Sequence, residues 1–120
     1  MLEARAHARY IRTSAQKAKL VLDLIRGKQA AEALSILRFT KKSVARDVEK
    51  LLRSAIANAV QTADRSQKRR VDEDDLYVAA CWANQGPTQK RVRPAPMGRA
   101  YRVIKRTAHL TVKVAERGEK

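Results

Sequence analysis

The sequence predicts an α+β fold, and three observations support this class. Apolar residues recur at helical spacing through much of the stretch 14–63. Residues 4–10 and 107–114 instead alternate apolar with polar or basic side chains, which is the period of a half-buried strand. Between them, residues 86–106 combine turn residues with many cations, and the distal half of this segment has no apolar face to bury. We expect a protruding basic β-hairpin there.

The first predicted strand covers residues 4–10. One set of side chains, small or aromatic, alternates with a basic set: Ala4, Ala6, Ala8 and Tyr10 against Arg5, His7 and Arg9. The first set would face the core and the second would form a basic face. Because the pattern is short, a disordered basic tail is the alternative that it leaves open.

Three helices are predicted after this strand. The first begins at Thr13 or Ser14, either of which can cap it, and ends near Gly27. The apolar faces of the first two helices are Ala18, Val21, Leu22 and Ile25, then Ala30, Ala33, Leu34 and Leu37. The third helix follows a cap at Thr40 or Ser43. It has the widest apolar stripe: Val44, Val48, Leu51, Leu52, Ala55, Ile56, Ala59 and Val60.

Strands are predicted again beyond the polar segment 64–75. The apolar run 76–83 has the length of a strand, and we expect its Cys81 and Trp82 to be buried. A second strand region spans 99–114, and its last part alternates cleanly. Two faces follow from this alternation: Ala108, Leu110, Val112 and Val114 toward the core, and Thr107, His109, Thr111 and Lys113 away from it.

The segment 86–106 is the most basic part of the chain. It holds seven cations and no acidic residue: Lys90, Arg91, Arg93, Arg99, Arg102, Lys105 and Arg106. Pro94, Pro96 and Gly98 indicate a turn near its middle. Roughly 12 residues per arm at about 3.3 Å each would carry the tip on the order of 40 Å from the core. Such a ribbon repels itself in water, so we expect an anionic partner around it.

Composition favours one intracellular, nucleic-acid-binding domain. The 120 residues suit a single domain with a modest core. A net charge of +15 points to a polyanion, and no apolar run approaches the roughly 18 residues of a membrane span. The single cysteine cannot form an internal disulfide, and residues 1–12 show no secretory signal pattern. We expect no membrane partner and no obligate homo-oligomer.

Three segments carry a resemblance to a known family. They read SAQKAKLVLDLIRGK at 14–28, SAIANA at 54–59 and GRAYRVIKRTAHLTVKV at 98–114, and GPTQKR at 86–91 completes the outgoing arm. In these segments the chain resembles the L-twenty-two proteins of the large ribosomal subunit, of the bacterial type. Their order and spacing also fit, so the resemblance covers essentially the whole chain.

The resemblance implies three helices packed on a three-stranded antiparallel sheet, with a long protruding basic β-hairpin. It divides the single domain 1–120 into a core of about 1–85 and 107–116 and a hairpin of about 86–106. The implied function is that of a structural constituent of the large subunit in the cytoplasmic ribosome, without enzymatic activity or cofactor. Implied partners are large-subunit (23S-type) rRNA, whose folding and assembly it supports, neighbouring ribosomal proteins, and the nascent polypeptide in the exit tunnel.

Site residues follow from the basic pattern and the resemblance together. Cations that pair with phosphates displace condensed counterions, and arginine can make two contacts at once. The residues expected to bind rRNA are Arg5, Arg9, Arg12, Lys17, Lys90, Arg91, Arg93, Arg99, Arg102, Lys105, Arg106, Thr107 and His109. By similarity, residues lining the tunnel are Gln89, Lys90, Arg91, Val92, Arg93, Pro94 and Ala95, of which the first three match a segment linked to altered macrolide response.

The tip departs from the family pattern. Where Pro-Arg-Ala-basic-Gly is common, this chain has Pro94-Ala95-Pro96-Met97-Gly98, so two cationic side chains are absent. Near the tip, Tyr101 could stack on an unpaired base or pack across the strands.

Two other functions are compatible with a small basic chain. An architectural DNA-binding protein would present basic β-arms to a duplex. A metal-dependent nuclease would need convergent carboxylates, whereas Asp72–Asp75 are consecutive on one short turn. His7 and His109 were expected on separate basic faces without a further ligand, and Asn58 as a satisfied group between helices. We therefore expect no catalytic and no metal site.

Overall fold

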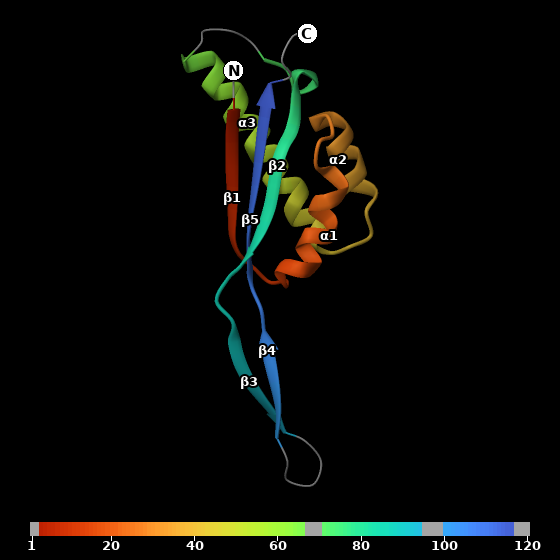
Figure 1. Ribbon diagram of the computed structural model, residues 1–120, viewed down its shortest axis with the longest axis vertical. Coiled ribbons are helices and arrows are strands. Elements are labelled where there is room, and N and C mark those ends of the chain that lie inside the picture. Colours follow the sequence, from red (N-terminus) through yellow and green to blue (C-terminus); the bar gives the residue numbers. More distant parts are fainter. Residues whose placement is uncertain (1–2, 67–70, 95–99, 117–120) are drawn as a thin grey trace.

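The computed structural model describes residues 3–66, 71–94 and 100–116, with the backbone alone for residues 66, 73, 89–94 and 100–104 (Figure 1). Within these ranges the order of elements is β1 (Glu3–Ile11), α1 (Ala15–Ile25), α2 (Ala30–Phe39), α3 (Val44–Ser66), a 3-10 turn η1 (Glu73–Asp75), β2 (Leu76–Gln85), β3 (Gln89–Pro94), β4 (Ala100–Lys105) and β5 (Ala108–Glu116). The molecule is elongated, 67 Å by 27 Å by 19 Å.

The core consists of one antiparallel sheet covered by helices on one face. Its strand order is β1-β5-β2, so the C-terminal strand lies in the centre. α3 packs on β1 and β5, and α1 packs on β2, while the opposite face of the sheet carries no helix of the described chain (Figure 1). The predicted α+β class, with three helices on a three-stranded antiparallel sheet, is confirmed. We call the uncovered side the open face.

The helix signals in the sequence correspond to real boundaries. The Ser14 side chain accepts a hydrogen bond from the backbone N–H of Lys17 and caps α1. Gly27 follows the last turn with a φ of 80°, a left-handed conformation that glycine adopts without strain. In α3, most of the predicted stripe is buried, but Val60 is exposed. Ala59 and Ala63 are both fully buried, so the buried face of the helix passes through these two residues and Val60 lies at its edge.

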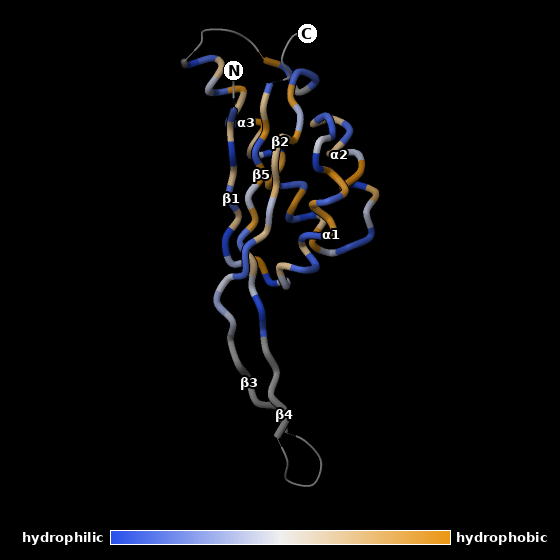
Figure 2. Tube along the Cα trace, in the orientation of Figure 1, coloured by the Kyte–Doolittle hydropathy of each residue, from blue (hydrophilic) through white to orange (hydrophobic). Residues whose placement is uncertain are grey.

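The buried core lies between the helices and the sheet. Its largest fully buried side chains are Leu22, Ile25, Leu52, Leu76, Leu110, Val21, Val48, Val78, Val112 and Val114. Figure 2 shows hydrophobic positions recurring along α1, α2 and α3, whereas the chain between β5 and β4 is hydrophilic. Most large apolar side chains of the helices and the sheet are thus buried between the two layers, and the hairpin extends from a polar end of the core.

Two bulges overturn two expectations about which residues face the core. The β2–β5 register shifts between Val78 and Ala80, and a one-residue shift reverses the alternation that follows. Cys81 is consequently buried, as expected, but Trp82 points to the open face and is 38% exposed. The β1–β5 register shifts in the same way between Ala8 and Ile11. Tyr10, expected on the core face, is 64% exposed.

Cys81 and Arg26 join α1 to β2. The Cys81 thiol donates to the carbonyl of Leu22 at 3.3 Å, and Arg26 Nη2 donates to the Cys81 carbonyl at 2.8 Å. Burial raises the pKa of the Cys81 thiol, with a smaller opposing effect of Arg26. The thiol is thus buried, hydrogen-bonded and protonated at neutral pH, which are the properties of an unreactive structural cysteine.

This environment predicts slow labelling of Cys81. We expect a thiol reagent to react at least about tenfold more slowly with the folded chain than with the chain in denaturant, because only an exposed thiolate is nucleophilic. The unfolded thiol ionises at lower pH than the folded one, so its contribution to stability is complete at neutral pH and is lost as pH rises through the raised pKa. Labelling rates, and urea titrations of Cys81→Ala across alkaline pH, would check both points. Equal labelling rates would contradict the first.

Candidate nucleic-acid interface

Most of the predicted rRNA-binding residues outside the arm lie at one end of the core, where the hairpin begins. β1 ends beside the start of β5, with Ile11 paired to Ala108, and α1 starts directly after β1. This arrangement brings together residues that are up to 100 positions apart in the sequence. We call the exposed cations of this region the basic junction: Arg9, Arg12, Lys17, Lys105 and Arg106.

A hollow of about 350 Å³ lies within the basic junction. Thr13, Ser14, Lys17 and Arg106 line it. Two cations therefore flank the first turn of α1, where backbone N–H groups and the helix dipole also favour an anion. The geometry suits a phosphate group, because charge, hydroxyl and N–H donors converge from two different segments of the chain.

Arg5 lies apart from this cluster. It is exposed and pairs in register with Lys113, further along the sheet from the hairpin. Its carbonyl accepts a hydrogen bond from Asn58 Nδ2 at 3.1 Å, so Asn58 connects α3 to β1. The expectation that Asn58 would bridge two helices is wrong, because α3 lies directly against this edge strand.

The hairpin positions are resolved at the level of the backbone. β3 and β4 pair antiparallel, from Gln89 with Lys105 to Pro94 with Ala100. Lys90, Arg91, Val92, Arg93, Tyr101 and Arg102 fall within this ladder. Ala95 and Arg99, together with the altered tip residues Pro96, Met97 and Gly98, lie outside the described residues.

The base of the hairpin is a close contact between its two arms. The Gly86 N–H donates to the Thr107 carbonyl at 2.9 Å, and the Thr107 hydroxyl donates to the Pro87 carbonyl at 2.6 Å. A Cβ on Gly86 would lie 2.6 Å from Thr107 Oγ1 and 3.2 Å from the His109 ring. Glycine fits here without displacing the side chains of Thr107 and His109, whereas any larger residue would have to move them. Thr107 thus has a structural contact in addition to its predicted rRNA role.

Gly86→Ala should therefore destabilise the chain by roughly 1–3 kcal/mol through overpacking. Thr107→Ala removes the clashing hydroxyl, so the double variant should lose less than the sum of the two single variants. The free energies of unfolding of the unmodified chain, the two single variants and the double variant, each measured by urea denaturation, form a double-mutant cycle. Strict additivity would mean that the two residues do not meet. Gly27→Ala is a useful comparison, since its Cβ would enter open space and only the backbone conformation would be strained.

A second hollow, of about 340 Å³, lies on the open face of the sheet beside the basic junction. Its lining is His7, Arg9, Tyr10, Trp82, Asn84, His109, Leu110 and Thr111. His7 Nδ1 lies 2.9 Å from the hydroxyl of Thr111, which provides that buried threonine with a partner. The expectation that His7 and His109 lie on separate faces is wrong, because adjacent strands place both on the open face.

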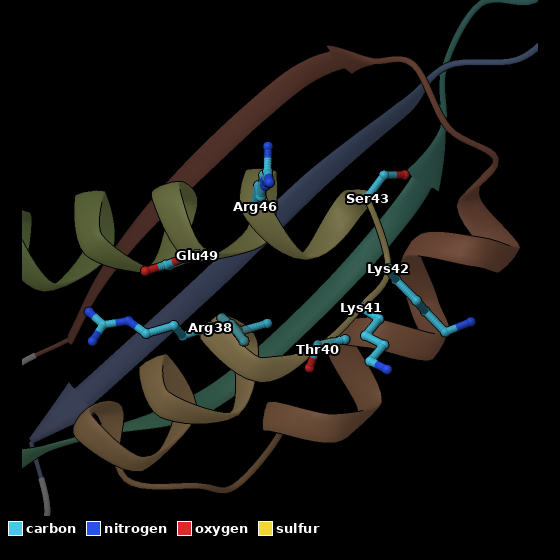
Figure 3. Close-up of a pocket in the computed structure, with 8 residues that line it drawn as sticks. Arg38, Thr40, Lys41, Lys42, Ser43, Arg46 and Glu49 are labelled. Carbon is cyan, nitrogen blue, oxygen red and sulfur yellow. The ribbon is translucent and has the colours of Figure 1, made fainter.

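Sequence reasoning missed a basic cluster at the corner between α2 and α3. A hollow of about 710 Å³ is lined by Arg38, Lys41, Lys42 and Arg46, with Leu37, Thr40, Ser43 and Glu49. Figure 3 shows the Lys41 and Lys42 side chains extending from the loop that joins the two helices. Glu49 accepts a hydrogen bond from Arg53 at 3.0 Å, so it offsets little of this charge. From the sequence, Thr40 and Ser43 are predicted only as helix caps.

The acidic run forms a local turn. The Asp75 carboxylate accepts from the backbone N–H of Asp72 at 3.2 Å, and the Asp75 N–H donates to the Asp72 carbonyl at 3.0 Å. Among the residues that the structure describes, no three His, Cys, Asp or Glu side chains are grouped to hold a metal ion. No helix in the same residues is long and apolar enough to cross a membrane.

Comparisons with known proteins agree with the architecture. The model of the family described as "Ribosomal protein L22p/L17e" matches residues 6–115. "Large ribosomal subunit protein uL22" of Solibacter usitatus (strain Ellin6076) is 54% identical over 116 residues, which cover 97% of this chain and 98% of the relative. The protein of the same name from Clostridium novyi (strain NT) is 48% identical over 116 residues, covering 97% and 99%. The chain therefore belongs to the ribosomal protein L22p/L17e family.

Proposed function

We propose that this chain is a structural constituent of the large ribosomal subunit in the cytoplasmic ribosome, where it binds large-subunit rRNA and contacts neighbouring ribosomal proteins. Membership of the family supports this role, and it places the chain in a structural class of proteins. The observation that carries the rRNA-binding surface is the convergence of five exposed cations at one end of the core, from β1, the β1–α1 connection, α1 and the hairpin base. Phosphates are the groups that such a surface binds.

Cations elsewhere extend this surface. We propose that the hairpin cations expected from the sequence, Lys90, Arg91, Arg93, Arg99 and Arg102, also bind rRNA, with Arg5 on the open face as a further contact. The corner between α2 and α3 adds another four cations from a different side of the core. Binding of separate rRNA segments at these surfaces would hold them in a fixed relation, which is how we propose that the protein supports rRNA folding and assembly.

We further propose that residues 1–85 and 107–116 act as the globular core and residues 86–106 as the extended hairpin. The hydrogen bond between Gly86 and Thr107 supports this boundary. The outgoing arm, from Gln89 to Ala95, would line the nascent-peptide exit tunnel. A photo-crosslinking residue at position 91 should then capture a stalled nascent chain, whereas one at the exposed Lys50 of α3 should not. Capture at neither position would contradict the tunnel role.

The decisive experiment is mass spectrometry of large subunits purified through a high-salt wash. We expect one copy of the chain per particle, because a protein held by rRNA on several sides resists removal. Its loss into the wash or into DNA-bound fractions would overturn the proposal.

The architectural DNA-binding alternative is not favoured, since the family is ribosomal. Competition between duplex DNA and an rRNA fragment at matched salt would test it directly.

A further inference from the structure

The hollow on the open face contains two exposed aromatic side chains that the core does not use. Trp82 on β2 is 38% exposed and Tyr10 on β1 is 64% exposed, and both line this hollow. Each reaches the open face because a bulge reverses the alternation of its own strand. Bulges often re-aim a side chain beside a functional site. Two independent bulges therefore place two aromatics, both expected in the core, at one surface.

Tyr10 is held in a costly backbone conformation. Its φ of 59° is left-handed, a region that tyrosine rarely occupies. Its backbone N–H donates to His109 Nδ1 at 3.2 Å, and its ring meets the His109 ring edge to face, with centroids 5.0 Å apart. These contacts fix the aromatic ring at the mouth of the hollow. A residue keeps a strained backbone conformation only where contacts with its surroundings hold it there. Such residues are concentrated at functional sites.

The chemistry of the lining selects the kind of ligand. Arg9 adds an exposed cation, and the exposed Asn84 offers both a donor and an acceptor. Leu110 also lines the hollow but is fully buried, so the exposed lining is aromatic and polar. A partner with aliphatic side chains would find little to pack against. A planar, polar ring that carries a nearby negative charge matches the aromatics, the amide and the cation together.

We propose that an unpaired nucleobase of RNA stacks in this hollow against Trp82 and Tyr10, with Arg9 at its phosphate and Asn84 at its edge. The inference rests on the proposed rRNA-binding function and names the part of the RNA that the open face recognises. Paired bases are stacked inside a helix and cannot enter. The open face is thus selective for single-stranded RNA, whereas the basic junction binds any phosphate backbone.

Trp82 is the only tryptophan, so its fluorescence reports on this hollow alone. The experiment titrates the full chain with a single-stranded oligoadenylate of about ten nucleotides, and separately with an RNA duplex of equal charge at the same salt. Anisotropy of a labelled RNA measures binding in each case. We expect both to bind, with quenching and a shift of the Trp82 emission for the single strand only. Binding of the single strand with unchanged emission would overturn the inference.

Variants separate stacking from charge. Tyr10→Gly, which also relieves the left-handed strain, and Trp82→Ala should each weaken single-strand binding roughly tenfold and leave duplex binding unchanged. Trp82→Phe should retain most of the affinity. Phe39→Ala is the matched control, because it removes an aromatic ring that is 82% exposed at the end of α2, outside the hollow.

Failure of this inference is distinguishable from failure of the proposed function. If both RNAs bind and the variants behave like the Phe39 control, the hollow is not a base site while rRNA binding stands. If neither RNA binds, both the stacking site and the rRNA-binding surface are wrong.

Discussion

Replacing Lys17 and Arg106 together with glutamine should lower the affinity for large-subunit rRNA on the order of a hundredfold at about 0.1 M salt. Both side chains line the hollow at the first turn of α1. Each cation that neutralises a phosphate releases about one condensed counterion, so each is worth roughly tenfold at this salt concentration. The hundredfold figure is the simple sum of the two losses. Because both side chains line one hollow, two cations that share a single phosphate would lose less than this sum.

Salt dependence provides the measurement. The slope of log K against log salt, from anisotropy titrations with an rRNA fragment, should become shallower by about two in the double variant. Lys28→Gln with Lys50→Gln removes the same charge from exposed positions away from the basic junction. This control should change the slope much less. Equal changes in the two double variants would mean that binding follows net charge alone and that the basic junction is not a defined contact surface.

The helices and the central strand follow closely from local sequence patterns. Ser14 and Gly27 delimit α1 because capping is a property of a few neighbouring residues. The alternation of Ala108, Leu110, Val112 and Val114 identifies the core face of β5, since a central strand is paired along both sides. In these elements the period of apolar residues and the buried face agree.

Positions beyond the bulges could not be predicted in the same way. Tyr10 and Trp82 continue the alternation of their strands in the sequence, yet a single extra residue in each strand turns them outward. No local signal specifies such a bulge, because it depends on pairing with β5, about 30 to 100 positions away. The hollow on the open face is therefore a product of tertiary structure, although its aromatic residues are visible in the sequence.

The candidate rRNA surface also has one part that local sequence predicts and one part that depends on tertiary structure. The cations of the hairpin were predicted from charge density alone, and the structure brings Arg9, Lys17 and Arg106 to its base. Arg38 and Arg46 were missed, since each is an ordinary exposed arginine on its own helix. The packing of α2 against α3 brings them to one hollow with Lys41 and Lys42. The four cations fall within nine consecutive residues, so their density was visible in the sequence, whereas the hollow that they line follows from the packing of the two helices.

Leu52→Ala should destabilise the free chain by about 2–5 kcal/mol, because it creates a cavity in the core. Leu52 is fully buried near the middle of α3, the helix that packs on β1, β5 and the other two helices. Truncation there removes buried apolar atoms from the helix that has contacts with two strands and both other helices. Because a domain of this size is stable by only about 5–15 kcal/mol, a substantial part of the total would be lost.

Urea denaturation followed by circular dichroism at moderate salt measures this loss, and Val60→Ala serves as its control. Val60 lies on the same helix and has a similar apolar side chain, but it is 38% exposed, so its truncation should cost less than about 1 kcal/mol. If the two variants unfold at the same urea concentration, α3 does not contribute its predicted apolar face to the core. A large difference would mean that the packing of α3 on β1 and β5 stabilises the protein before any RNA is bound.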